Sequence, residues 1–303
     1  MNLREAFLFQ SRACADLGSP FMGRLMALAA ERFSEDGPIG QRLFSWPGDL
    51  SPRGASVPLR FGGALHALVL SGNKDLAQVY PPHDVDDDAL WAVVERALTD
   101  HEADILTWLN NAPQTNEVRR SAAMISAAHW LTVRYGLPIN LSELGASAGL
   151  NLMFDHFALV VGGTRFGPTD TGVVLTPDWT GATPPQSEPR IAGRRGVDLN
   201  PLDPSTPEGQ LRLRAYLWPD QTHRRALTDA AIAVARAQVD KADAIGWLAT
   251  RLDPVPGHIH LIYHTIAWQY FPPAVQAEGE AMLARAGAAA SANAPLARLA
   301  MVG

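Results

Sequence analysis

The chain has 303 residues, of which 47% are hydrophobic and 18% charged, a composition typical of a globular protein that buries a sizeable core. Its formal net charge of −6 argues against a nucleic-acid-binding surface spread over the molecule. Cys14, the single cysteine, excludes an intrachain disulfide and a cysteine-cluster metal site, and it fits a reducing compartment.

The location expected for this protein is the cytoplasm. No apolar stretch approaches the roughly 18–20 residues that a membrane span needs. The first residues lack the basic region, apolar core and cleavage site of a secretory signal. We therefore expect no membrane partner.

Residues 1–136 are predicted to form a helical subdomain. Apolar residues recur at helical spacing in four segments, which are 20–33, 61–70, 88–109 and 114–135. Thr115 or Asn116 is expected to cap the last helix, and Gly136 is expected to end it. We expect about four helices here, which would serve as a lid or as the substrate-binding part.

Residues 137–303 are predicted to form an α/β domain. Strands are expected at 139–144, 190–199, 258–264 and 295–303, and helices at 223–237, 244–252 and 273–290. Strands that alternate with helices indicate a parallel sheet with helices on both faces. An insertion near 157–190 is expected to hold a hairpin of residues 157–161 and 171–175 and an exposed loop.

The last predicted strand, 295–303, would leave an exposed sheet edge. Such edges are normally covered, because unpaired backbone groups invite association with other chains. We therefore expect either a domain truncated at its C-terminus or a partner strand that pairs with this edge. The oligomeric state stays open.

The segment Glu143-Leu-Gly-Ala-Ser-Ala-Gly149 joins the strand 139–144 to a helix expected from Leu150. Glycines in such a turn let the backbone approach a ligand closely, and the following helix N-terminus favours electron-rich groups. Open parallel sheets bind ligands at the carboxyl ends of their strands. The spacing does not match the dinucleotide pattern G-x-G-x-x-G, because Ser147 and Leu150 occupy its second and third glycine positions. An ordinary turn with small packing residues is the alternative interpretation.

The same segment resembles the acidic-x-G-x-G-x-G loop of class I S-adenosylmethionine-dependent methyltransferases, with Ser147 in place of the middle glycine. The resemblance implies a Rossmann-like sheet and S-adenosylmethionine as cofactor. It implies that Glu143 helps to hold the amino-acid end of that cofactor. Gly145, Ala146, Ser147 and Gly149 would make room for it.

Two aspartates resemble further elements of that family. Asp198, at the end of the second strand, suits the residue that binds the ribose, because a carboxylate can accept hydrogen bonds from both hydroxyls of a diol. The alternative is a turn cap before Pro201. Asp243 resembles the acidic residue near the third strand that contacts the adenine amino group, and a plain helix N-cap is its alternative.

The strand 258–264 ends in the candidate catalytic residue. His264 is a candidate general base for a substrate hydroxyl or amine, because its ordinary pKa lies near neutrality. Trp268, Gln269 and Tyr270 would line the substrate pocket. A core histidine bonded to a backbone carbonyl is the alternative. We expect no metal site, because His258 and His264 would lie about 20 Å apart along one strand.

Phrases over nearly the whole chain resemble a bacterial family known as domain of unknown function 2332. They are Gly18-Ser-Pro20, Gln114-Thr-Asn-Glu-Val118 with Arg120-Ser-Ala122, Glu143 to Leu152, Gly196-Val-Asp198 with Asp203, Tyr216-Leu-Trp-Pro-Asp-Gln221, and His264 with Trp268-Gln-Tyr270. This resemblance implies a helical N-terminal part followed by a methyltransferase-like domain, and it brings no established reaction.

Three polar residues precede the first strand of the α/β domain. In methyltransferase folds, an N-terminal helix at this place often covers the ligand. Asn116 and Arg120 would share a helix face, with Glu117 beside them. They are candidates for contact with the amino-acid end of the cofactor or with the substrate, and a solvated helix start is the alternative.

The sequence thus predicts an S-adenosylmethionine-dependent methyltransferase whose acceptor, a small molecule or a protein, is unknown. The alternative is a non-catalytic protein with a methyltransferase-like fold, which binds an adenosyl ligand or has a regulatory role. It is favoured by the lack of an Asn/Asp-Pro-Pro-aromatic element after the fourth strand. A nucleotide-dependent oxidoreductase is disfavoured by the glycine spacing, and no nucleic-acid partner is indicated.

Overall fold

A computed structural model describes residues 1–302 and divides into two compact units. The helical unit comprises Met1–Thr115 and Pro207–Arg225, and the α/β unit comprises Asn116–Thr206 and the chain from Ala226 onward. The segment Asn116–Tyr135, which we assigned by its pattern to the helical part, lies in the α/β unit. The helical unit also takes in a segment from much later in the chain.

The helical unit holds more helices than the sequence analysis found. They are α1 (Leu3–Asp16), α2 (Pro20–Arg32), α3 (Gly37–Phe44), α4 (Val57–Leu70), α5 (Lys74–Ala77), α6 (Asp87–Asp100), α7 (Glu102–Leu109) and α9 (Pro207–Ala215). The long helix predicted over 88–109 is two helices, because the backbone leaves helical geometry at His101, with φ −122° and ψ 29°. Three phenylalanines, Phe7, Phe33 and Phe61, meet at centroid distances of 5.2 to 6.3 Å and form the aromatic centre of this core.

Side-chain caps start several of these helices. α1 begins with a capping box, in which Asn2 accepts from the Glu5 amide and Glu5 accepts from the Asn2 amide, both at 2.9 Å. The Ser19 hydroxyl accepts from the amide of Met22 at the start of α2. These caps satisfy amides that the helices leave unpaired and so fix where each helix starts.

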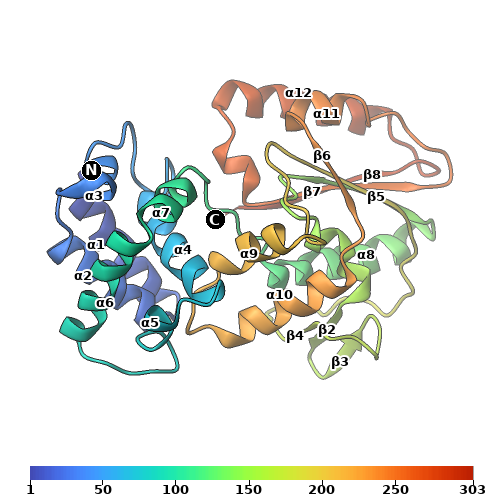
Figure 1. Ribbon diagram of the computed structural model, residues 1–303. Coiled ribbons are helices and arrows are strands. Elements are labelled where there is room, and N and C mark those ends of the chain that lie inside the picture. Colours follow the sequence, from blue (N-terminus) through green and yellow to red (C-terminus); the bar gives the residue numbers. More distant parts are fainter. Residues whose placement is uncertain (303) are drawn as a thin grey trace. The chain divides into compact units, whose positions relative to one another are not determined.

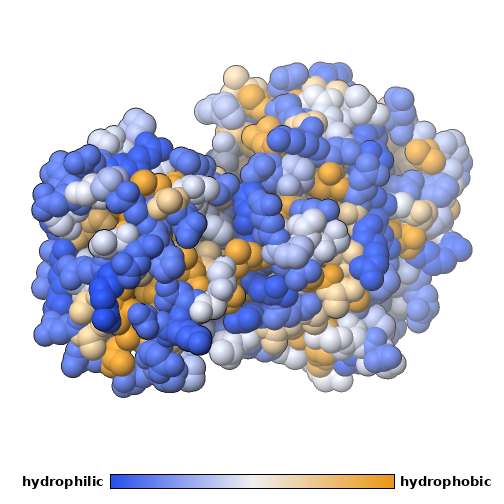
Figure 2. All heavy atoms as spheres, in the orientation of Figure 1, coloured by the Kyte–Doolittle hydropathy of each residue, from blue (hydrophilic) through white to orange (hydrophobic). Residues whose placement is uncertain are grey.

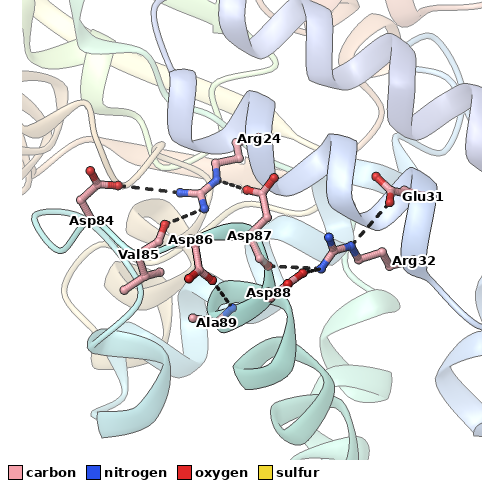
Figure 3. A network of polar contacts seen from close by, with 9 residues as sticks. All are labelled: Arg24, Glu31, Arg32, Asp84, Val85, Asp86, Asp87, Asp88 and Ala89. Carbon is pink, nitrogen blue, oxygen red and sulfur yellow. Dashed lines mark hydrogen bonds and ion pairs between the residues drawn. The ribbon is translucent and has the colours of Figure 1, made fainter.

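Two arginines of α2 bind the N-terminal end of α6 (Figure 3). Arg24 Nε lies 2.5 Å from Asp87, and one of its other nitrogens donates to the Val85 carbonyl at 2.6 Å. Arg32 donates to Asp88 at 2.8 Å. Since both carboxylates are more than half exposed, solvent screens both ion pairs. The network orients the two helices more than it stabilises them.

The α/β unit is built on a five-stranded sheet in which all neighbours are parallel, in the order β6-β5-β1-β7-β8. The strands are β1 (Ile139–Leu144), β5 (Ile191–Asp198), β6 (Gln238–Lys241), β7 (Ile259–Thr265) and β8 (Leu296–Met301). Figure 1 shows α11 (Ala244–Ala249) and α12 (Pro273–Ala289) on one face and α8 (Ser121–Tyr135) and α10 (Thr222–Val234) on the other. The predicted parallel sheet with helices on both faces is confirmed.

The strand order has a reversal beside β1. From β1 the chain moves outward to β5 and β6, and it then returns to β7 on the other side of β1 and continues to β8. The loops after β1 and β7 therefore diverge at a topological switch point, which is where open sheets of this kind bind ligands. β6 and β8 are the edge strands. β6 was not recognised in the sequence.

Two local predictions in this unit are wrong. Residues 171–175 do not form a hairpin with 157–161. Instead β2 (Ala158–Val161) pairs antiparallel with β3 (Thr164–Phe166), because Gly162-Gly163 supplies a tight turn with both φ values positive, and β4 (Val174–Leu175) lies parallel to β2.

The helix predicted from residue 114 is the second error. Asn116 does not cap it, because helical backbone starts only with the 3-10 turn η1 (Val118–Arg120), which leads into α8. The Glu117 side chain accepts from the Arg119 amide at that start, at 3.1 Å. Asn116 and Arg120 therefore do not share a helix face.

No helix among residues 1–302 is long and apolar enough to cross a bilayer. In the face drawn in Figure 2, hydrophilic residues cover most of each unit, and hydrophobic residues are scattered between them.

Candidate functional site

The turn after β1 is held in a left-handed backbone conformation at three positions. Gly145, Ser147 and Gly149 have φ values of 70°, 52° and 72°. The amides of Gly145 and Ala146 both donate to the Val197 carbonyl at the end of β5, at 2.9 and 3.0 Å. These two hydrogen bonds fix the turn to the neighbouring strand.

Both outer glycines of this turn are required by packing. A Cβ on Gly145 would lie 2.3 Å from the Ala267 Cβ, in the loop after β7. A Cβ on Gly149 would lie 2.9 Å from Val239 Cγ2 on β6. The alternative interpretation of the turn, small residues for packing, thus describes part of what the glycines do. The close approach to Ala267 also joins the two loops of the switch point.

The helix expected from Leu150 has a different form. Residues Leu150–His156 form a 3-10 helix, η2, with non-helical backbone at Met153. The Leu150 amide, at its start, donates to Asn116 Oδ1 at 2.9 Å. A short irregular helix aligns few peptide dipoles, so the helix-terminus argument for attracting an electron-rich ligand does not hold here.

Glu143 is the most unusual titratable residue of the site. It is fully buried at the end of β1, and burial raises the pKa of its carboxyl well above the ordinary value. Oε2 accepts from the Tyr263 hydroxyl at 3.4 Å, whereas Oε1 is buried without any hydrogen-bond partner. An unpaired buried carboxylate is costly, so a cation or a hydrogen-bond donor that reaches Oε1 would stabilise the ionised form of this carboxyl.

Two more buried polar atoms near Glu143 have no partner. One is Oγ of Ser147, in the turn. The other is Nδ2 of Asn151. The main-chain carbonyl of Asn151 lies 3.3 Å from the Tyr263 hydroxyl and shares its one hydrogen with Glu143 Oε2, and the side-chain Oδ1 of Asn151 accepts from Ser121 at 2.7 Å. Native proteins leave few such atoms, so this group of three on one turn and its flanks is a candidate place for a polar ligand.

Asp198 closes the other side of the turn. Its Oδ2 accepts from the Ser147 amide at 2.8 Å, and its Oδ1 accepts from the Asn200 amide at 2.9 Å. The second bond is the turn cap that we named as the alternative. Asp198 thus lies beside the turn at the end of β5, where its carboxylate can accept more than one hydrogen bond.

Asp243 serves as the N-cap of α11. Its Oδ1 accepts from the amides of Ile245 and Gly246 at 3.1 and 2.8 Å. The helix-cap alternative is therefore what the structure contains, and a role toward adenine would fall to Oδ2.

The segment before α8 connects the two loops of the switch point. Asn116, which is buried, binds the amide of Leu150 after the β1 turn. One Arg120 nitrogen donates to the Thr265 carbonyl at the end of β7, at 3.2 Å. Glu117 pairs with Arg119 at 2.9 Å. Asn116 and Arg120 thus stand beside the turn, although not through the helix face that we predicted.

His264 lies on the opposite face of the sheet from Glu143. Tyr263 is paired with Glu143 across β1 and β7, and consecutive residues of a strand point to opposite faces. The His264 ring stacks on Trp268 with centroids 5.0 Å apart, and its Nε2 lies 3.5 Å from the Arg298 guanidinium. Burial, and then Arg298, lower the pKa of His264 to about 4.

The pocket residues predicted after β7 are not alike. Trp268 is buried against His264, Tyr270 is 57% exposed, and the Gln269 amide donates to the Ile266 carbonyl at 3.2 Å in a 3-10 turn, η3 (Ala267–Tyr270). Ile266 has φ 72° and ψ −31°, a strained conformation for a β-branched residue. Such strain concentrates at functional sites. Sequence analysis missed this position, as it missed Tyr263 and Asn151.

The fold and the polar turn together define an α/β protein with a candidate ligand site at the carboxyl edge of a parallel sheet. A family model matches residues 4–302, described as an uncharacterized protein conserved in bacteria (DUF2332). The chain belongs to this family. Neither the curated proteins nor the solved structures yielded a match.

Proposed function

We propose that the chain binds S-adenosylmethionine at the carboxyl edge of the sheet and transfers its methyl group to an acceptor. The observation that carries this proposal is the buried carboxyl of Glu143, whose Oε1 lacks a partner beside the glycine turn. A buried acid of this kind is stabilised in its ionised form by an ammonium group. The amino-acid end of S-adenosylmethionine carries such a group.

The strand order supports this placement of the ligand. In order along the sheet, the five strands are the third, second, first, fourth and fifth of the sheet in the chain, as in doubly wound nucleotide-binding sheets of Rossmann type. The turn that resembles the methyltransferase loop follows the first of them, and Asp198 ends the second. A methyltransferase-type Rossmann-like fold is therefore part of the proposal.

Each residue of the turn has a chemical task in this proposal. Glu143 accepts from the ammonium of the amino-acid end, and Asp198 accepts from the ribose hydroxyls. Ser147 Oγ, which has no partner, provides a further hydrogen-bonding group. When bound, the cofactor supplies an electrophilic methyl group, and the protein contributes mainly orientation, which is a large part of the rate enhancement in such transfers.

His264 is the candidate residue for the acceptor side of the reaction. A pKa of about 4 makes His264 a weak base at neutral pH, and its Nε2 faces Arg298. This arrangement favours the second candidate function, a protein that binds the adenosyl ligand without chemistry. The helical unit, as lid or substrate-binding part, remains a further element of the proposal.

Calorimetric titration with S-adenosylmethionine, S-adenosylhomocysteine and NAD tests the ligand. We expect both adenosyl ligands to bind and NAD to bind much more weakly; tight binding of NAD alone contradicts both candidate functions. Transfer of label from methyl-labelled S-adenosylmethionine to extract components then separates the enzyme from the non-catalytic binder.

A further inference from the structure

A cavity of about 360 Å³ lies within the α/β unit, at a place that the proposed adenosyl site does not use. Its walls come from α8, from η2, from β3 and its following turn, and from residues 186–189. We call it the α8 cavity. None of the residues assigned to the adenosyl ligand lines it. Its volume lies at the small end of ligand pockets, which suits a molecule with a single ring.

The floor of the α8 cavity is aromatic. Phe154, Phe157 and Phe166 line it and are at most 2% exposed. The ring of His129 meets the Phe166 ring edge to face, with centroids 5.1 Å apart. Aromatic rings in these positions favour a planar apolar ligand body.

His129 offers an acceptor in this cavity. The Ser187 hydroxyl has one hydrogen for two contacts, the His129 carbonyl at 3.2 Å and His129 Nδ1 at 3.0 Å; with that hydrogen on the carbonyl, which can only accept, Nδ1 is the donor. In a neutral imidazole the proton is then on Nδ1 and Nε2 is an acceptor. Burial lowers the pKa of His129 and so favours this neutral form. A ligand would have to bring a donor to it.

Arg165 offers a positive charge. Its Nε and Nη2 donate to the Pro168 carbonyl at 3.2 and 2.9 Å, Nη2 also donates to the Thr169 carbonyl at 3.3 Å, and no carboxylate among residues 1–302 forms an ion pair with it. Asp155 in the cavity wall is neutralised by Arg194, which binds both its oxygens at 2.6 and 2.8 Å. Glu188, the remaining charged group of the wall, is exposed. Since the two carbonyls occupy Nε and Nη2, Nη1 is the group of Arg165 that an anion would reach.

We propose that the α8 cavity binds a small aromatic carboxylic acid that carries a hydroxyl group. The ring lies among the three phenylalanines, the carboxylate binds the Arg165 guanidinium, and the hydroxyl donates to His129 Nε2. Charge-assisted hydrogen bonds from a guanidinium to a carboxylate are among the stronger polar contacts in proteins.

Titration of the full chain with benzoate, 3-hydroxybenzoate, 4-hydroxybenzoate and benzylamine tests this site. We expect the better hydroxybenzoate to bind with a Kd of ~1 mM or tighter and more tightly than benzoate. Arg165→Gln should weaken it at least about tenfold. Arg134→Gln is the matched control, since Arg134 is an exposed arginine on α8 that does not line the cavity.

Two readouts keep the test decisive if Arg165→Gln does not fold. In the unaltered protein, the NMR signals of the His129 ring and the Arg165 Nε–H should shift on titration, and Arg134 signals should not. His129→Phe should remove the preference for the hydroxybenzoate over benzoate. Benzylamine binding in place of the acids, equal affinity of the Gln variant, or shifts confined to other residues would overturn the proposal.

Discussion

Glu143 illustrates how a single buried carboxyl links stability to binding. Its folded pKa is raised by burial, whereas the unfolded group titrates near 4.5. Above pH 4.5 the unfolded chain loses its proton while the folded protein retains it, so the stability that this group contributes falls as pH rises.

We predict that Glu143→Gln, which keeps the shape and removes the titration, is at least as stable as the parent at pH 8. The difference between the two should shrink toward pH 4.5. Urea unfolding at a series of pH values measures this. A variant that is destabilised equally at pH 4.5 and pH 8 would show that the carboxyl is not protonated in the folded protein.

Ser147 has the left-handed backbone conformation that the turn requires, with φ 52°. A non-glycine residue in left-handed conformation costs roughly 1–2 kcal/mol, and glycine adds about 0.5–1 kcal/mol of unfolded-chain entropy. Ser147→Gly should therefore stabilise the protein by about 0.5–1 kcal/mol, with the buried Oγ also removed. Ala148→Gly, at the next position and without positive φ, should destabilise it. Chemical denaturation of both variants checks this, and a loss of stability in Ser147→Gly contradicts the account.

The residue types and their spacing predicted that Glu143, Ser147 and Asp198 lie near one another. The carboxyl ends of adjacent parallel strands meet at the same edge of a sheet. The sequence did not predict which residues contact Glu143. Tyr263 meets Glu143 only through the register of β7 against β1, and Asn151 only through the irregular η2. No local pattern predicts such register.

Among the elements, the loops after β1 and β7 depend on each other. Gly145→Ala combines a positive φ with a Cβ that would collide with Ala267, so we expect a loss of about 2–4 kcal/mol. Gly136→Ala is the matched control. Gly136 has φ 65° and open space around its would-be Cβ, so only the conformational cost of about 1 kcal/mol remains. Equal losses in denaturant unfolding would mean that the two loops are not packed as described.

The sequence predicted the helices and strands in which a periodic pattern of apolar residues runs over many positions. It missed the elements that only a short pattern marks. The segments α2, α4, α12, β1 and β7 follow from their patterns. The helix α1 was missed although Asn2 and Glu5 form a recognisable capping box. β6 has only four residues, none of them fully buried, and so carries no alternation to detect.

At the scale of the whole molecule, acid should destabilise both units. Burial is the first cause that lowers the pKa of His66, in the helical unit, and of His260 and His264, in the α/β unit, to about 4. A histidine with a depressed folded pKa contributes stability above its unfolded pKa of 6.5, and loses it as pH falls toward 4.

His66 is 5% exposed, and its protonation should lower the free energy of unfolding by about 3 kcal/mol in all. We predict that the free energy of unfolding decreases between pH 6.5 and 4, and that His66→Gln makes this decrease smaller. Fluorescence-detected urea unfolding at pH 7, 6, 5 and 4 measures both. An unchanged slope in the variant contradicts the buried, neutral state of His66.

The central claim is that Glu143 is kept buried for a ligand rather than for the fold. The most direct measurement is calorimetric titration of S-adenosylhomocysteine into the parent protein and Glu143→Gln, with urea unfolding of both at the same pH. The account predicts a variant that is as stable as the parent or more so, and that binds the ligand at least about tenfold more weakly. Unchanged affinity, or no binding by the stable parent protein, would contradict it.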